Sequence, residues 1–187
     1  MQVLILSGSR NPEGRTARAT DAITRGITRA GGSTERFFLT ELNLERCRQC
    51  DSDGWGVCRN EGYCVIEDDF AMLVEKIKSS DVVVFANPVY FFDLTESMRG
   101  FLDRLRRICA HQKIKPTEGI SAAGLCLAGG GGGGAPTACV NLERILQVCG
   151  FDIIDMIPLR RQNLEAKLPV LELTGEWLAT KPTSKAE

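Results

Sequence analysis

The chain has 187 residues, of which 43% are hydrophobic and 25% are charged, and its formal net charge is −1 at pH 7. This ordinary globular composition excludes disordered and fibrous proteins, and the near-neutral charge argues against binding to nucleic acid or to an anionic membrane. No apolar run approaches the roughly 18 to 20 residues that a membrane span requires. Residues 1–7 lack the basic lead and the long apolar stretch of a signal peptide, so we expect a cytoplasmic protein.

The hydrophobic pattern alternates between strands and helices along the chain. An apolar run at residues 3–6 predicts the first buried strand, and helical periodicity follows over residues 15–30. Pro169 is expected at an end or a kink of the last helix, because proline lacks the N–H that a helix interior uses. The further predicted strands cover 36–39, 82–86, 120–128 and 151–157, and the further predicted helices cover 70–77, 94–108, 140–148 and 164–178.

This alternation predicts a doubly wound α/β fold, with a five-stranded parallel sheet and helices on both of its faces. We expect a single domain over residues 1–187, with a cysteine-rich insertion at about 43–67 and a C-terminal extension from about residue 160. In such sheets, ligands bind beyond the carboxyl ends of the strands. The loops after the first, third and fourth strands are therefore the candidate site.

The loop after the first strand carries hydroxyls, arginines and glycines just ahead of a helix. The free N–H groups and the dipole at a helix N-terminus favour an anion, which indicates a phosphate site. A Walker A loop is excluded because five residues separate Gly8 from Gly14 and Arg15 stands in place of the lysine. The dinucleotide fingerprint also fails, since Arg10 replaces its second glycine. A phosphate monoester is the expected ligand, and a plain helix cap with surface arginines is the alternative.

The two later loops carry aromatic residues and glycines. Residues 90–92 are three consecutive aromatics after Pro88, and exposed aromatics at a sheet edge are candidates for stacking on a flat ring. Residues 129–134 are six glycines, which are costly to order and are expected where the backbone approaches a ligand closely. The alternatives are a packing corner for the aromatic loop and a mobile surface loop for the glycines.

Taken together, these loops resemble those of the flavodoxin-like NAD(P)H-dependent FMN reductases and their relatives, the iron–sulfur flavoproteins. The resemblance covers about residues 1–160 and implies a flavodoxin-like fold. It also implies an FMN-dependent oxidoreductase that passes electrons from NAD(P)H to a quinone, a flavin or another small acceptor. The matching segments are 7–10 with 14–16, 88–91 with the helix that follows to residue 104, the glycine run, and 64–69.

By this resemblance, FMN binds where the three loops meet. The chain departs from the family at Phe92, where a small residue is common, and at Arg15, where asparagine is common. Hydride transfer to a flavin needs stacking and alignment but no protein nucleophile, so no catalytic acid or base is expected. The resemblance further implies a homodimer or homotetramer. The implied cofactor-binding residues are Ser7, Ser9, Arg10, Gly14, Arg15, Thr16, Pro88, Val89, Tyr90, Phe91, Phe92, Gly129, Gly130 and Gly131.

Cys47, Cys50, Cys58 and Cys64 crowd into one polar segment and are candidate metal ligands. Four thiolates at this spacing can ligate a [4Fe–4S] cluster or a tetrahedral zinc ion, and thiols that stay free or form disulfides are the third alternative. The iron–sulfur flavoproteins have a compact C-x₂-C-x₂-C arrangement, whereas seven residues separate the second and third cysteines here. A cluster would favour an alternative function, an iron–sulfur flavoprotein that carries electrons to a protein partner. A metal-binding or redox-sensing module is a third function.

The remaining basic residues suggest no site. The arginines at 104, 106 and 107 could attract the phosphates of a nicotinamide cofactor, but a charged outer helix face is the interpretation we adopt. The only histidine, His111, is expected to be a solvated surface residue.

Overall fold

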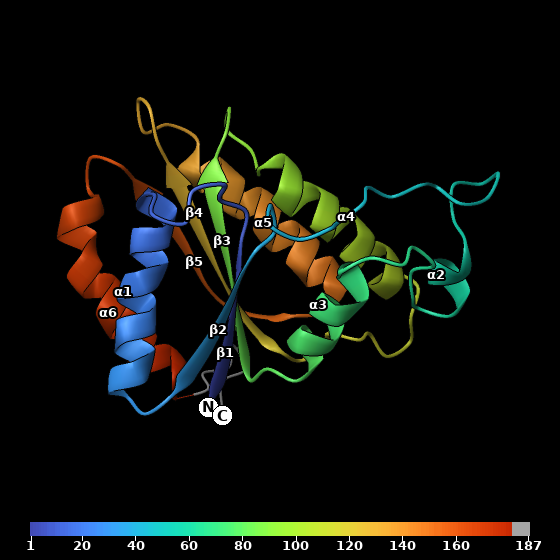
Figure 1. The fold of residues 1–187 in the computed structure, drawn as a ribbon, viewed down its shortest axis with the longest axis horizontal. Coiled ribbons are helices and arrows are strands. Elements are labelled where there is room, and N and C mark those ends of the chain that lie inside the picture. Colours follow the sequence, from blue (N-terminus) through green and yellow to red (C-terminus); the bar gives the residue numbers. More distant parts are fainter. Residues whose placement is uncertain (181–187) are drawn as a thin grey trace.

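The computed structural model describes residues 1–180 and contains a five-stranded sheet (Figure 1). Its order is β2-β1-β3-β4-β5, and every neighbouring pair is parallel, which confirms the predicted doubly wound sheet. The chain leaves β1 toward one edge and β3 toward the other, so a crevice opens between the loops that follow these two strands. The strands are β1 (Gln2–Ser7), β2 (Ser33–Phe38), β3 (Val82–Val89), β4 (Ser121–Ala128) and β5 (Asp152–Arg160).

Helices cover both faces of the sheet, as predicted (Figure 1). One core cluster joins Val3 and Ile5 to α1 and α6, and the other joins Leu4 and Leu6 to α3, α4 and α5. These four residues belong to β1. Successive side chains of a strand point to opposite faces, so both faces of the buried strand β1 must be apolar. The helices are α1 (Arg15–Arg29), α2 (Val57–Asn60), α3 (Phe70–Lys78), α4 (Glu96–Cys109), α5 (Ala135–Cys149) and α6 (Leu164–Leu178).

The last helix, α6, packs closely on α1 through two glycines. A Cβ at Gly26 would overlap the backbone carbonyl of Glu172, and a Cβ at Gly175 would overlap that of Ile23. Arginines of α1 also pair with glutamates of α6, for example Arg18 with Glu165 at 2.8 Å. Exposed pairs of this kind contribute little stability, so the close backbone contact dominates the packing.

The structure corrects several predicted boundaries. β2 begins three residues before residue 36, because an edge strand that is half-exposed needs no apolar run. α5 begins at Ala135, directly after the glycines, and small residues such as Ala138 form its first buried turn. Pro169 lies inside α6, so of its two predicted positions, an end or a kink of the helix, the end is wrong. Among residues 1–180, no helix has both the length and the apolarity needed to cross a membrane.

Candidate functional site

The loops after β1, β3 and β4 enclose a cavity of about 560 Å³ at the carboxyl edge of the sheet. This volume lies within the range of small-molecule and cofactor sites. Except for Ser7 and Arg10, all the predicted cofactor-binding residues line this cavity. Asn11, Leu127, Gly132 and Gly133 also line it and were not predicted. The lining residues are Ser9, Asn11, Gly14, Arg15, Thr16, Pro88, Val89, Tyr90, Phe91, Phe92, Leu127, Gly129, Gly130, Gly131, Gly132 and Gly133.

The first loop presents hydroxyls and a free helix end to the cavity. Ser9 and Thr16 are both buried, and Gly14 occupies the N-cap of α1 without any side-chain capping bond. The backbone N–H of Asn11 donates to Ser9 Oγ at 3.2 Å, and Ser9 Oγ donates back to the Asn11 carbonyl at 3.2 Å, which curls the loop around this end. The uncapped N–H groups of the first turn of α1 therefore suit an anion such as a phosphate.

Ser7 and Arg10 lie outside this cavity. The Ser7 side chain is fully buried, and its Oγ accepts a hydrogen bond from the Ser9 N–H at 3.3 Å. Ser7 therefore stabilises the conformation of the loop without lining the cavity. The Arg10 guanidinium lies 3.8 Å from the Glu96 carboxylate, and Arg10 lines a second cavity between the segment that follows β2 and α4. Serine and arginine each occur twice in residues 7–16, once at the cavity and once outside it, so residue type alone did not predict which side chains line the cavity.

Asn87 joins the first loop region to the start of α4, a role that the sequence did not indicate. Its Oδ1 accepts bonds from Thr95 N at 3.0 Å and from Thr95 Oγ1 at 3.1 Å. Thr95 then caps α4, because its Oγ1 accepts the Met98 N–H at 3.3 Å. Gly8 passes so close that a Cβ there would lie 2.5 Å from Thr95 Oγ1. This glycine is therefore needed to bring the loops together.

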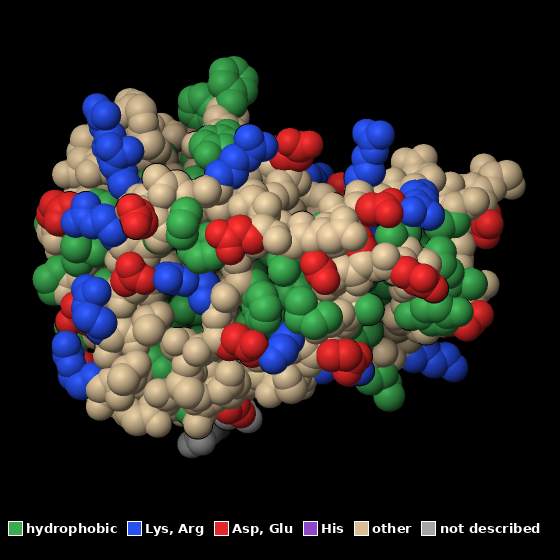
Figure 2. Space-filling view, viewed as in Figure 1, with side chains coloured by type: hydrophobic (Ala, Val, Ile, Leu, Met, Phe, Trp, Pro, Cys, Tyr) green, Lys and Arg blue, Asp and Glu red, His purple; other side chains and the backbone are tan. Residues whose placement is uncertain are grey.

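The loop after β3 is a tight aromatic turn, residues 90–93. The backbones of Tyr90 and Asp93 exchange two hydrogen bonds of 3.2 and 3.1 Å. Phe91 and Phe92, at the tip, have φ values of 49° and 69°, in the left-handed region where two-residue hairpin turns normally place Asn or Gly. Figure 2 shows hydrophobic side chains projecting from the surface above the end of β3, where Figure 1 places this turn.

The six glycines play two different parts. At Gly134, φ is 85° and a Cβ would lie 2.7 Å from the Phe92 Cα, so the aromatic turn packs against backbone that no other residue can supply. At Gly129 and Gly131, no heavy atom lies within 4 Å of where a Cβ would stand. Bare backbone thus faces open space in the cavity, which suits the close approach of a flat ligand.

The four predicted metal ligands line one small cavity, together with Arg104 and Arg107. Among residues 1–180, however, no three His, Cys, Asp or Glu side chains are placed to share a metal ion. The seven residues between Cys50 and Cys58 form a turn, closed by a 2.8 Å bond from Asp51 N to the Trp55 carbonyl, and lead into α2, which carries Cys58. The predicted [4Fe–4S] or zinc site at Cys47, Cys50, Cys58 and Cys64 therefore has no support in the structure.

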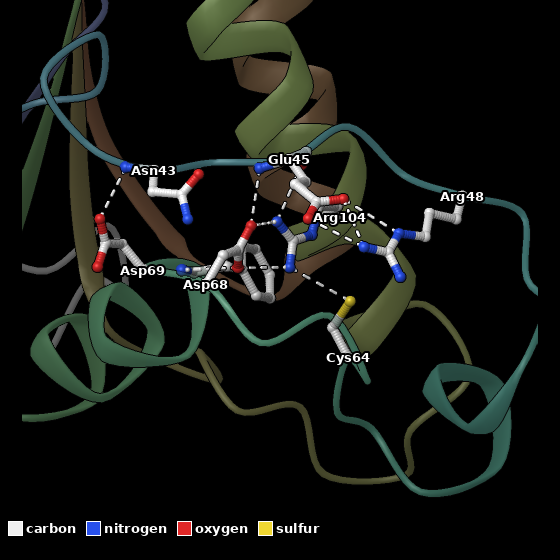
Figure 3. A network of polar contacts seen from close by, with 8 residues as sticks. Asn43, Glu45, Arg48, Cys64, Asp68, Asp69 and Arg104 are labelled. Atoms are coloured by element: carbon white, nitrogen blue, oxygen red, sulfur yellow. Dashed lines mark hydrogen bonds and ion pairs between the residues drawn. The ribbon is translucent and has the colours of Figure 1, made fainter.

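A buried ion pair holds the cysteine segment to α4 (Figure 3). The Arg104 guanidinium donates to the two Asp68 carboxylate oxygens at 2.6 and 2.9 Å, and both side chains are almost fully buried. Arg104 also donates to the Glu45 carbonyl at 2.9 Å and to Cys64 Sγ at 3.4 Å, and it stacks 4.2 Å above the Phe70 ring. The interpretation of Arg104 as part of a solvated helix face is therefore wrong.

The surroundings of this pair set its charge state. Burial acts to raise the pKa of Asp68, but hydrogen bonds from Arg104 and from the Glu45 and Phe70 N–H groups outweigh it, so the pKa lies below its ordinary value. Burial acts to lower the pKa of Arg104, whereas Asp68 and Cys64 raise it above the usual value. Both groups are charged at neutral pH.

His111 is exposed, as predicted, and its ring lies edge-on to the Trp55 ring, with 4.7 Å between the ring centres.

Sequence comparison gives consistent results for most of the chain. The NADPH-dependent FMN reductase family model matches residues 1–162. The chain is similar to an iron-sulfur flavoprotein of Methanocaldococcus jannaschii, with 32% identity over 106 residues, or 57% of this chain and 52% of that protein. An iron-sulfur flavoprotein of Methanosarcina thermophila is 22% identical over 154 residues, or 82% of this chain and 77% of that protein. The match to the first of these relatives thus spans about half of its length.

Solved structures show the same fold. NAD(P)H:quinone oxidoreductase from Methanothermobacter marburgensis superposes with a TM-score of 0.70 and 22% identity, over 95% of this chain and 96% of that one. RosB with bound 8-demethyl-8-formylriboflavin-5′-phosphate superposes with a TM-score of 0.71 and 19% identity, over 96% of this chain and 79% of that one. An archaeal flavodoxin superposes with a TM-score of 0.63 and 13% identity, over 97% and 98%. The predicted flavodoxin-like fold is confirmed.

Proposed function

The chain belongs to the NADPH-dependent FMN reductase family, and from this premise we propose that it binds FMN in the cavity between the three loops. We propose further that it passes electrons from NAD(P)H to a quinone, a flavin or another small acceptor. One observation carries the proposal: an uncapped helix N-terminus, an aromatic turn and a bare glycine backbone all border one cavity. These are the groups that a phosphate, a flat ring and the edge of that ring require.

We assign a different part of FMN to each wall of the cavity. Ser9, Thr16 and Arg15 would bind the phosphate together with the first turn of α1. Residues 88–90 and Phe92 would lie against the isoalloxazine, and the backbone of residues 129–131 would border its edge. When bound, FMN supplies the redox chemistry, taking up a hydride from the nicotinamide and releasing two electrons to the acceptor. The protein binds, orients and shields the reacting rings, and no side chain of the cavity is needed as an acid or a base.

Flavin binding and reduction test this proposal in sequence. The protein should bind FMN saturably and more tightly than riboflavin, which lacks the phosphate, and anaerobic NAD(P)H should then bleach the visible absorption of the bound flavin. Equal affinity for FMN and riboflavin would remove the phosphate site from the proposal. A protein that takes up FMN but is not reduced by NADH or NADPH would contradict the proposed electron donor.

The alternative of an electron carrier with an iron–sulfur cluster is not adopted. The names of the relatives suggest this alternative. Within the described part of the chain, residues 1–180, however, the thiols of residues 47–64 are not close enough together to ligate a metal ion. We therefore derive no electron-transfer step through this segment. The cytoplasmic location and the homodimer or homotetramer remain predictions.

A further inference from the structure

The tip of the aromatic turn exposes a phenylalanine that the fold does not use. The Phe91 side chain belongs to a residue that is 94% exposed, whereas its neighbours Tyr90 and Phe92 are 56% and 55% exposed. Its ring contact within residues 1–180 is an edge-on approach to Phe92 at 5.9 Å. A bare aromatic ring in water is unfavourable, so burial of apolar surface cannot explain this residue.

The conformation of the turn is unfavourable as well, and Phe91 does not contribute to holding it. With φ at 49°, Phe91 adopts a left-handed conformation that bulky residues rarely occupy. The turn is secured by its other residues: Phe92 packs on Gly134, and Asp93 Oδ1 accepts bonds from Leu94 N at 2.7 Å and from Asn141 Nδ2 at 3.1 Å. The surrounding structure thus fixes the backbone so that the Phe91 ring stands in solvent at the mouth of the cavity.

We propose that Phe91 is a specificity-determining residue that stacks on the planar ring of the second substrate when that substrate enters over the flavin. This inference rests on the proposed function, because a ring entering the cavity needs a bound flavin beneath it. The chemistry that Phe91 recognises is a flat, conjugated ring, which a quinone, a free flavin and a nicotinamide share. Inorganic acceptors lack such a ring and gain nothing from Phe91.

The charges around the turn favour a neutral ring over a charged ligand. Tyr90, Phe91 and Phe92 present three rings without a formal charge, and the only acid in the turn, Asp93, is engaged by Leu94 N and Asn141. Arg15, the cation among the residues that line the cavity, belongs to a different element, the start of α1. The rim near β3 therefore offers aromatic surface for stacking and no free charged group for a charged ligand.

The test separates stacking from turn conformation through the choice of substitution. Phe91→Asn removes the ring but keeps a residue that tolerates positive φ, and Phe91→Trp enlarges the ring. Ile114→Asn is a matched control, because Ile114 is 83% exposed and lies in the loop before β4, at the other end of the sheet from the cavity. Each FMN-loaded protein is reduced anaerobically with dithionite and mixed with either menadione or ferricyanide in a stopped-flow instrument.

We expect Phe91→Asn to lower the second-order rate constant for menadione roughly three- to tenfold, the range of one aromatic pair, and to leave ferricyanide unchanged. Phe91→Trp should keep or raise the menadione rate, and Ile114→Asn should change neither rate. The rate of reduction by NADPH, measured separately, shows whether the nicotinamide uses the same ring; a loss there supports the stacking role for the donor too.

Three results would overturn the inference. Equal losses for menadione and ferricyanide would show an effect on the flavin itself, as would a weaker FMN affinity in Phe91→Asn. Dissociation of an oligomer by Phe91→Asn in sedimentation would show that the turn is a contact between copies of the chain. A wild-type protein that binds no FMN would instead refute the proposed function, and the two failures are therefore distinguishable.

Discussion

The rim of the cavity and the cysteine segment at residues 43–67 are both built from loops, but different forces hold them. The rim is organised by backbone, through glycines such as Gly134 and through the turn at residues 90–93. The cysteine segment is held by side chains, above all by the buried pair of Arg104 and Asp68. A backbone scaffold leaves side chains free to contact a ligand, whereas the charged groups of Arg104 and Asp68 are fully used in holding the cysteine segment to α4.

The largest expected effect is on the side-chain scaffold. Replacing Arg104 with Met would leave Asp68 buried without its partner and should lower the free energy of unfolding by about 3–5 kcal/mol. Arg99→Met on the same helix is the control, since Arg99 is half-exposed and its pair with Asp103 is 3.6 Å long; we expect a change below about 1 kcal/mol. Urea unfolding measures both. Similar losses in the two variants would refute the special role of the buried pair.

The backbone scaffold should respond to alanine in a position-dependent way. Gly134→Ala should destabilise the protein by about 1–3 kcal/mol, because φ is 85° there and the new methyl group meets Phe92. Gly131→Ala has open space around it and should leave the unfolding midpoint unchanged while weakening FMN binding. Thermal unfolding with and without FMN distinguishes these outcomes. Two variants that behave alike would contradict the division of the glycine run into two parts.

A free side chain at the rim should affect binding without affecting stability. Arg15→Ala should weaken FMN binding by about three- to tenfold, because an exposed cation contributes modestly to a phosphate site. Riboflavin affinity is the control and should not change. Unaltered FMN affinity in a correctly folded variant would remove Arg15 from the phosphate site.

The smallest expected effect is the loss of stability at low pH. The folded-state pKa of Asp68 is lowered, so its stabilisation is fully present above its unfolded pKa of about 3.9 and is lost as the pH falls through the folded value. Stability measured between pH 3 and pH 7, roughly, should thus decline at the acid end, and part of that decline should be missing in Asp68→Asn. Parallel pH profiles for the two proteins would contradict the assignment.

The sequence was sufficient for the features that repeat along the chain. Buried strands such as β3 show continuous apolar runs, and the loops after β1, β3 and β4 carry residue types that have few structural uses. The sequence was insufficient where a residue's role depends on a contact with a distant residue or on an unusual backbone conformation. Arg104 is one of four arginines in α4, and its contact with Asp68, 36 residues earlier, distinguishes it. Likewise, no pattern reveals that Phe91 and Phe92 adopt positive φ, or that Arg10 turns away from the cavity.

The glycine contact between α1 and α6 has a consequence for how the protein is made. Because α1 precedes α6 in the chain, α1 leaves the ribosome before the helix that packs on it. The surface of α1 around Gly26 therefore stays uncovered until α6 is made, and the apolar residues beside it are exposed in the nascent chain. Since the N-terminus of α1 also borders the cavity, we expect FMN to bind only after α6 has packed on this helix.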